Sequence, residues 1–146
     1  MAAADGRPVA LVTGGARRLG RAMALYLAGR GFDLAIHYDR SADDARATAD
    51  QARDMGVAAQ VFQADLLDAD ATAALIPQVG RAMGRLAVLV NNASIFEHDT
   101  IHSATMASWD RHIGSNLRAP FQLIQAFAAQ AAPVATDTEG EPVATA

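Results

Sequence analysis

The chain has 146 residues, a length that suits one domain with a hydrophobic core. Its 16 acidic and 12 basic residues give a net charge of −4, so no general attraction to nucleic acid or to an anionic membrane surface is expected. All the basic residues are arginine, and the chain has neither lysine nor cysteine, which excludes lysine-amine chemistry, thiol chemistry and disulfides within the chain. The start has no apolar signal-peptide core and no apolar run approaches about 18 residues, so we expect no secretion and no membrane span, and a cytoplasmic location is the default.

Short apolar runs alternate along the chain with longer segments whose apolar residues have helical spacing. Continuous apolar strands separated by helix-length crossovers form parallel sheets with helices on both faces. The sequence therefore predicts an α/β fold with a doubly wound parallel sheet. In chain order we expect a strand at residues 8–13, a helix at 19–30, a strand at 32–38, a helix at 42–55, a strand at 57–63, a helix from 68 or 70 to about 83, a strand at 86–90 and a last helix at about 107–131.

Several residues are typical of helix ends and helix breaks. Ser41 suits the cap of the second helix, and Asp68 or Asp70 suits the start of the third. Pro77 lies inside the third helix and marks a position for a kink or a break. In the last helix, Trp109 is expected to pack the helix onto the sheet.

The chain divides into one domain and a tail. We expect the domain to cover residues 1–131, because the alternation of strands and helices ends there. Residues 132–146 contain proline, glycine and acidic residues and no aromatic residue. This composition predicts a disordered tail.

The strongest local signal is the segment Thr13-Gly14-Gly15-Ala16-Arg17-Arg18-Leu19-Gly20, between the first strand and the first helix. Gly14 permits a tight turn with positive φ, and small residues let backbone N–H groups approach a diphosphate at the positive end of the helix. Arg17 and Arg18 can add charge-assisted hydrogen bonds to phosphate. The spacing departs from G-x-G-x-x-G, and a glycine turn with two solvated arginines is the alternative to nucleotide binding.

Further pieces follow this turn in one continuous order along residues 8–131. They are Gly15-Ala16-Arg17-Arg18-Leu19-Gly20, His37-Tyr38-Asp39-Arg40-Ser41, Gln63-Ala64-Asp65-Leu66, Asn91-Asn92-Ala93-Ser94-Ile95-Phe96 and Gly114-Ser115-Asn116. In them the chain resembles the short-chain dehydrogenase/reductase family, and more narrowly its pteridine-reductase branch. The resemblance implies a Rossmann-like sheet of about four strands in the order 3-2-1-4. It also implies the cofactor-binding residues Gly14, Arg17, Arg18, Leu19, Gly20, His37, Tyr38, Arg40, Ser41, Asp65, Leu66, Asn92, Ala93 and Ser94.

The residues after the second strand bear on which dinucleotide is bound. An acidic residue there hydrogen-bonds the 2′-hydroxyl of NAD and repels the 2′-phosphate of NADP, so Asp39 favours NAD. Arg40 and Ser41 suit a 2′-phosphate, and Arg18 is placed to reach the same group. The pteridine-reductase branch uses Tyr-x-Arg-Ser for NADPH, with Asp39 at its variable position. We therefore expect NADP(H) in preference to NAD(H), with a plain solvated turn as the alternative.

The ends of the third and fourth strands carry three residues with roles implied by the resemblance. Asp65 would hold the adenine ring, Asn92 would stabilise the sheet and Ala93 would line the cofactor. The carboxyl ends of parallel strands are where ligands bind in open α/β sheets. A helix-capping carboxylate is the alternative for Asp65, and a polar turn without a ligand is the alternative for the asparagine pair.

The loop after the fourth strand is the expected substrate side. Ser94 and Phe96 match positions that, in the pteridine-reductase branch, contact the cofactor and stack on the pterin ring. Arg18 is a third candidate, because it can pair with substrate oxygens as well as with phosphate. Ordinary core or lid packing is the alternative for Phe96. The histidines of this region lack the spacing of a metal site, and no metal is expected.

One catalytic position of the family is matched and the others are not. Asn116 matches an asparagine that orders a water in the family's proton relay. The family's proton donor is a tyrosine followed four positions later by a lysine, which lowers the tyrosine pKa. Tyr26 and Tyr38 are not followed by lysine, so we expect this chain alone to be inactive. A nucleotide-binding or interaction module without catalysis, and a structural domain without a ligand, are the alternatives.

The chain matches only the N-terminal half of the family's fold, and two of its surfaces would therefore lack the elements that normally pack against them. The strand at 86–90 becomes a sheet edge, and the last helix, with Phe121, Ile124 and Phe127, lacks part of its packing surface. We therefore expect a homo-oligomer, or association through this edge strand and the last helix, in addition to a small-molecule substrate.

Overall fold

A single parallel sheet organises the computed structural model, which describes residues 6–130. Its strands are β1 (Val9–Val12), β2 (Asp33–Tyr38), β3 (Ala59–Gln63) and β4 (Leu86–Val90), in the spatial order β3-β2-β1-β4. The predicted strand order and sheet type are confirmed. The predicted tail at 132–146 lies outside the described residues.

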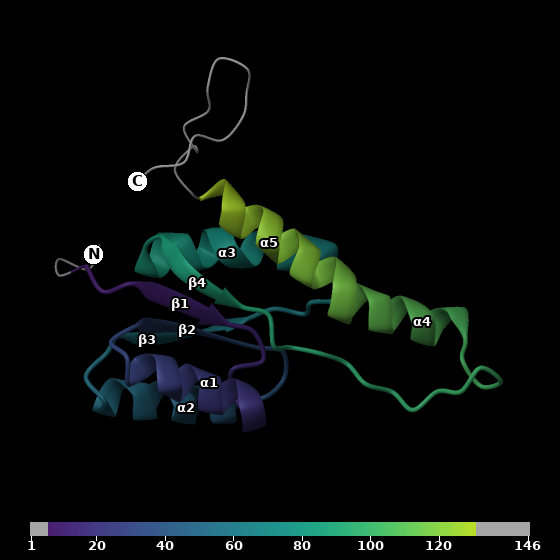
Figure 1. The fold of residues 1–146 in the computed structure, drawn as a ribbon, viewed down its shortest axis with the longest axis horizontal. Helices are drawn as coiled ribbons and strands as arrows, with labels where there is room; N and C mark the ends of the chain where they lie inside the picture. The colour runs from purple at the N-terminus through teal and green to yellow at the C-terminus, as the bar shows by residue number, and fades with distance from the viewer. Residues whose placement is uncertain (1–5, 131–146) are drawn as a thin grey trace, which may run out of the picture.

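Helices cover both faces of the sheet (Figure 1). On one face lie α1 (Arg18–Ala28) and α2 (Ala42–Asp54), and on the other lie α3 (Ala69–Met83) and α5 (Ala119–Ala129). Each crossover returns the chain to the same end of the sheet, so the carboxyl ends of all four parallel strands lie together at the opposite end. No helix among the described residues is long and apolar enough to cross a membrane.

Two hydrophobic clusters, one on each face, hold the layers together. Beneath α1 and α2 the helices contribute mainly small side chains, such as Ala24, Ala45 and Ala49, which pack against Leu34 and Ile36 of β2. The second cluster is built from larger side chains of α3 and α5, which are Leu75, Ile76, Val79 and Leu123. Alanine lets a helix approach the sheet closely, so the alanines on the inner faces of α1 and α2 are core residues.

Of the residues predicted to cap or break helices, only some act as predicted. Asp68 caps α3 as predicted, because its carboxylate accepts hydrogen bonds from the backbone N–H groups of Asp70 and Ala71. Ser41 occupies the N-cap position of α2, yet within the described residues its hydroxyl caps no backbone N–H. Pro77 lies inside α3, which continues through it. Pro77 and Ala73, four residues earlier, are both exposed, so the carbonyl that proline leaves without an N–H partner faces water.

The last predicted helix is continuous and is interrupted only by one π-helical turn. It comprises α4 (Met106–Ile113), a π-helical turn at Gly114–Arg118 and α5. The prediction that Trp109 packs this helix onto the sheet is wrong, because its side chain is 59% exposed. The cause is geometric: α4 extends past the end of the sheet, so at this point of the helix there is no strand to cover the indole (Figure 1).

Candidate nucleotide-binding site

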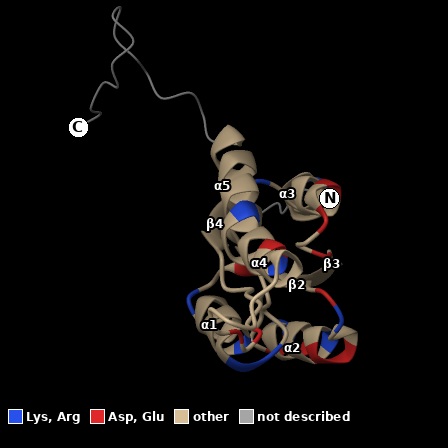
Figure 2. Ribbon diagram, turned by 90° about the vertical axis from the view of Figure 1, so that its right-hand side faces the viewer, with Lys and Arg blue, Asp and Glu red and all other residues tan. Residues whose placement is uncertain are grey.

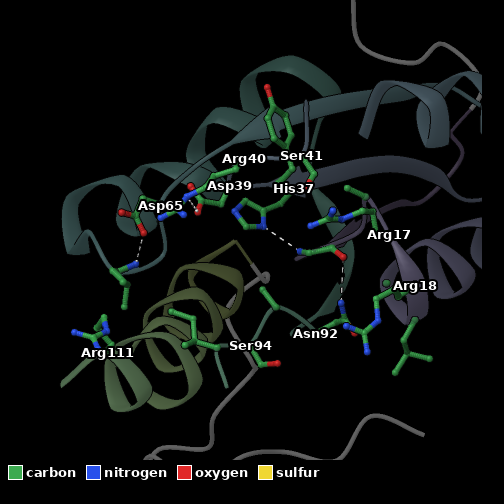
Figure 3. A pocket seen from close by; sticks show the side chains of 18 of the residues that line it. Arg17, Arg18, His37, Asp39, Arg40, Ser41, Asp65, Asn92, Ser94 and Arg111 are labelled. Atoms are coloured by element: carbon green, nitrogen blue, oxygen red, sulfur yellow. Dashed lines mark hydrogen bonds and ion pairs between the residues drawn. The ribbon is translucent and has the colours of Figure 1, made fainter. Parts of the chain in front are cut away.

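A pocket of about 780 Å³ lies at the carboxyl ends of the strands. Turns that follow all four strands contribute to its lining, together with the start of α1 and one residue of α4 (Figure 3). The lining residues are Gly14, Ala16, Arg17, Arg18, Leu19, Gly20, His37, Tyr38, Asp39, Arg40, Ser41, Asp65, Leu67, Asn92, Ala93, Ser94, Ile95, Glu97 and Arg111. All but one of the predicted cofactor-binding residues are thus brought together, and the exception is Leu66.

The turn between β1 and α1 has the geometry that its glycines predict. Gly14 adopts a φ of 61°, in the left-handed region. A Cβ on Gly20 would lie 2.0 Å from the carbonyl oxygen of Gly14, so only glycine allows the helix to start this close to the turn. Arg18, the first residue of α1, has a φ of 51°, which is unusual for a residue with a side chain. The first turn of α1 carries no acidic residue, so its positive end is open to an anion.

Thr13 and Asn92 join this turn to the end of β4. The Thr13 hydroxyl oxygen accepts hydrogen bonds from the backbone N–H groups of Asn92 and Ala93, both at 3.0 Å. In return the Asn92 side-chain amide donates to the carbonyl oxygens of Thr13 at 3.0 Å and Gly14 at 3.3 Å. Asn92 therefore fixes two walls of the pocket relative to each other.

His37 joins the same turn to the end of β3. Its Nδ1 accepts a hydrogen bond from the Gly14 N–H at 3.1 Å, and its Nε2 lies 3.0 Å from the Ala64 carbonyl oxygen. Because a carbonyl oxygen can only accept, the ring carries its proton on Nε2 and is neutral. Burial lowers the pKa of His37, because the charged ring would lose its hydration.

The rim after β2 carries exposed charges. Arg40 forms an ion pair with Asp39, with 3.3 Å between the Arg40 Nε and an Asp39 carboxylate oxygen, and the Arg40 side chain is 92% exposed. Arg17 lies 3.6 Å from a carboxylate oxygen of Asp44 in another exposed pair. Exposed ion pairs of this kind contribute little to stability, so both arginines are free to turn towards an anion in the pocket.

The turn after β3 places its residues differently from the expectation. Asp65 lines the pocket, and its carboxylate accepts a hydrogen bond from the Leu67 N–H at 2.9 Å. Leu66 points instead into the core beneath α3 and α5 and is only 7% exposed. Leu67 supplies the apolar surface of the pocket at this point. The sequence does not show which of these two neighbouring leucines faces the pocket.

The loop between β4 and α4 is fastened to the helix by side chains. Asn116 donates to the Ile95 carbonyl oxygen at 2.8 Å and accepts from the Ile95 N–H at 2.9 Å. The Glu97 N–H donates to Nε2 of His112 at 3.0 Å. Asn116 therefore acts here as a clamp on the loop backbone, and it does not line the pocket.

An ion pair on this loop forms part of the pocket wall. Arg111 binds the Glu97 carboxylate through two nitrogens, at 2.7 and 2.5 Å. This bonding lowers the pKa of Glu97 and raises that of Arg111. Neither residue is predicted from the sequence, because two opposite charges 14 positions apart on a loop and a helix form no recognisable pattern.

Two predicted substrate residues have different surroundings. Ser94 lines the pocket, whereas Phe96 is 85% exposed and lies outside the lining. Arg18, the third candidate, lines the pocket, so it stays a candidate both for binding phosphate and for binding substrate.

A strand–turn–helix pocket of this kind, at the carboxyl ends of a 3-2-1-4 parallel sheet, defines a dinucleotide-binding fold. Residues 8–142 match the family described as short chain dehydrogenase, and the chain belongs to that family. It is 39% identical over 116 residues to the 3-oxoacyl-[acyl-carrier-protein] reductase FabG of Staphylococcus aureus, which covers 80% of this chain and 47% of that protein. It is 37% identical over 115 residues to the acetoacetyl-CoA reductase of Paracoccus denitrificans, covering 79% of this chain and 46% of that one.

Solved structures have the same fold. The FolM alternative dihydrofolate reductase 1 of Brucella suis, in complex with NADP, superposes with a TM-score of 0.80 at 41% identity, covering 89% of this chain and 53% of that one. A short chain dehydrogenase of Burkholderia cenocepacia in complex with NADP superposes with a TM-score of 0.81 at 38% identity, covering 84% and 50%. The chain thus spans about half the length of the relatives it matches.

Proposed function

We propose that this chain is the nucleotide-binding half of an NADP(H)-dependent short-chain oxidoreductase. The observation that carries the proposal is the pocket formed by the turn at residues 14–20 together with the ends of all four strands. Gly14 and Gly20 let backbone and helix N-terminus approach a diphosphate, and Arg17 and Arg18 flank it. The bound dinucleotide supplies the hydride, and the residues described here hold and orient it.

The choice of NADP(H) rests on the charges of the rim after β2. Arg40 is almost fully exposed, and it is held only by a surface pair with Asp39. A 2′-phosphate is a stronger partner for a guanidinium than this single carboxylate, because it carries up to two charges and three acceptor oxygens. Ser41 adds a hydroxyl donor on the same rim. Solved structures of FolM from Brucella and of other relatives in complex with NADP support the assignment.

The other ends of the strands would hold the rest of the cofactor. Asp65 and Leu67 form one side of the pocket, and Ala93 forms another, which suits a flat adenine ring between polar and apolar surfaces. Ser94 lies next along the chain, towards the loop that α4 fastens. The clamp by Asn116 keeps this loop in place without a direct contact to the pocket.

The substrate that we propose is a pteridine. Two observations support it: Arg18 lines the pocket, where its guanidinium can pair with substrate oxygens, and the structure of an alternative dihydrofolate reductase superposes at 41% identity. The second candidate is a 3-oxoacyl thioester, which the identity with FabG and with an acetoacetyl-CoA reductase favours. The two candidates separate by binding: the NADP-loaded chain should bind dihydrofolate more tightly than acetoacetyl-CoA, and the reverse order would favour the thioester.

Catalysis needs a proton donor that this chain does not supply. With no lysine in its sequence, it holds no Tyr-x-x-x-Lys pair. We propose that the chain binds the dinucleotide but transfers no hydride, and a purely nucleotide-binding role is therefore the second functional candidate. NADPH oxidation with dihydrobiopterin, followed at 340 nm, should not exceed the enzyme-free rate; measurable turnover would overturn this part of the proposal.

Association through the last helix belongs to the same proposal. Phe121 and Ile124 of α5 are 58% and 54% exposed, and β4 forms an edge of the sheet. The α5 ribbon carries no charged residue, whereas charges gather around α1 and α2 (Figure 2). An apolar surface of this kind favours contact with another chain, and a second copy presents the same surface.

Calorimetric titration tests the nucleotide proposal. NADPH should bind the chain in a 1:1 complex, more tightly than NADH. Arg40→Ala should weaken NADPH by about tenfold, the loss of a charge-assisted hydrogen bond, and leave NADH unchanged. Arg46→Ala is the matched control, because Arg46 is also a solvated arginine in an ion pair but lies outside the pocket. Equal affinity for the two nucleotides would remove the 2′-phosphate assignment, and no binding of either would remove the proposal.

A further inference from the structure

His37 is the one buried histidine of the pocket lining, and nothing in the proposed function uses its ring. The side chain is 2% exposed and lies at the junction of three strand ends (Figure 3). Its two ring nitrogens are both engaged, one by the turn after β1 and the other by the turn after β3. A residue that joins two walls of a pocket in this way can set their separation.

We propose that His37 is a positioning residue, which holds the diphosphate turn in its binding shape through the Gly14 N–H without contacting the nucleotide. The inference rests on the proposed nucleotide site and assigns a new role within it. The histidine matched a cofactor-contacting motif in the sequence, but its ring is occupied by backbone partners on both sides. Its contribution to affinity is therefore indirect.

The hydrogen bonds explain why the turn depends on this ring. The acceptor of the Gly14 N–H lies outside the turn, in the side chain of His37. Nδ1 of His37 supplies that acceptor at 3.1 Å, and the Gly15 N–H donates to the His37 carbonyl oxygen at 3.0 Å. Two consecutive N–H groups of the turn are thus bound to one residue. A buried N–H left without its acceptor carries a desolvation cost that favours another turn shape.

The ring holds the turn only in its neutral form. Protonation at Nδ1 would place an N–H opposite the N–H of Gly14, and the hydrogen bond would be lost. Burial already keeps the pKa of His37 below its ordinary value of 6.5, so the neutral form prevails at neutral pH. Affinity for the nucleotide should therefore decrease as the pH falls below about 6.5 and the ring begins to take up a proton.

Charged groups from every wall of the pocket act on this titration. Asp39 favours the protonated ring by its charge, as does the hydrogen bond to Ala64. The other charged residues of the lining are Arg17 and Arg18 on the turn after β1, Arg40 after β2, Asp65 after β3, and Glu97 and Arg111 across the pocket. A bound diphosphate would itself favour a charged ring. The test must therefore distinguish loss of the turn from attraction to the anion, since the two change affinity in opposite directions.

Two substitutions separate the two ring nitrogens. In His37→Asn the side-chain oxygen can occupy the place of Nδ1 and accept from Gly14, with no titrating group. In His37→Gln the amide nitrogen can occupy the place of Nε2 and donate to Ala64, while the Gly14 N–H loses its acceptor. Thermal unfolding of both variants at pH 7.5 checks that each remains folded.

The experiment measures the Kd for NADPH at pH 7.5 and pH 5.5. At pH 7.5 we expect His37→Asn to bind within about threefold of the wild type and His37→Gln to bind at least tenfold more weakly. Between pH 7.5 and 5.5 the Kd of the wild type should rise by a larger factor than that of His37→Asn. This comparison removes the titration of the 2′-phosphate, whose pKa near 6 is common to both proteins. Equal binding by His37→Gln and wild type, or a wild type that gains affinity relative to His37→Asn at pH 5.5, would overturn the proposal.

Amide hydrogen exchange at Gly14 in the nucleotide-free chain separates this proposal from the proposed function. The protection factor of Gly14 should fall at pH 5.5 in the wild type and at both pH values in His37→Gln, and it should stay high in His37→Asn. If no form of the chain binds NADPH, the proposed function fails, and the exchange data still decide whether His37 holds the turn. Unchanged protection in His37→Gln would refute the positioning role.

Discussion

Gly20→Ala is the substitution that tests the dinucleotide turn most severely, although it adds only one methyl group. The added Cβ would lie 2.0 Å from the Gly14 carbonyl oxygen, 2.6 Å from the Asn92 amide nitrogen and 2.8 Å from the Gly14 carbonyl carbon. Two of these three atoms belong to the backbone of Gly14, which cannot move aside as the end of a flexible side chain can. The start of α1 and the turn must separate by about 1.4 Å to restore an ordinary contact near 3.4 Å.

The cost follows from what that separation breaks. Asn92 donates from its amide to the carbonyl oxygens of Thr13 and Gly14, and each such bond contributes about 1 kcal/mol net. Overpacking adds about 1–3 kcal/mol, and the better helix propensity of alanine returns about 1 kcal/mol. We therefore expect the free energy of unfolding to fall by about 2–4 kcal/mol, together with at least a tenfold loss of NADPH affinity.

Gly80→Ala is the matched control for this substitution. Gly80 lies in α3, and a Cβ there would meet nothing within 4 Å, so the variant should be more stable by about 0.5–1 kcal/mol with unchanged NADPH binding. Urea unfolding of the two variants beside the wild type gives both free energies. If Gly20→Ala is as stable as Gly80→Ala, the close approach of α1 to the turn is not a property of the folded protein.

Four more outcomes are expected. Arg18→Gly should be about 0.5–1 kcal/mol more stable than Arg18→Ala in urea unfolding, because only glycine adopts a φ of 51° without strain, while both variants lose NADPH affinity equally; an equal free energy would contradict the strained turn. Thr13→Val should lower the free energy of unfolding by about 1–3 kcal/mol, because Thr13 is 1% exposed, the Ala93 N–H loses its acceptor and the Asn92 N–H keeps only the Val90 carbonyl oxygen; a neutral substitution would contradict the network. Replacing Phe121 and Ile124 together by glutamate should lower the sedimentation coefficient if the exposed face of α5 drives association, and an unchanged value would exclude that face. The free energy of unfolding of the wild type relative to His37→Asn should fall as the pH drops from about 6.5, because the pKa of His37 is lowered in the folded state and the unfolded chain takes up the proton first; parallel pH curves would refute this.

Features with local causes were the ones that the sequence predicted well. The strands have bounds within two residues of the expected ranges, because each is a continuous apolar run between polar turns. Asp68 was recognised as a cap because the bond it makes spans only two or three residues. The residues of the pocket were found because the carboxyl ends of parallel strands meet at one edge, so a strand assignment already places the turns together.

Contacts between distant segments explain the failures. The pair of Glu97 and Arg111 exists only because α4 returns over the loop after β4, and neither residue has a neighbour in sequence that signals this. Trp109 shares the apolar spacing of the last helix, but spacing does not show where the sheet beneath it ends. The bridging hydrogen bonds of His37 were not visible in the sequence, because its partners come from two other turns.

Mapping the amide signals of the chain on addition of NADP⁺ shows whether the turn at residues 14–20 holds the diphosphate. We expect saturable shifts at residues 14–20, with further shifts at 37–41, at Asp65 and at 92–94, and little change along α5. Shifts confined to other surfaces, or a spectrum in which the amides of 14–20 do not move at saturating nucleotide, would show that this turn does not hold the diphosphate.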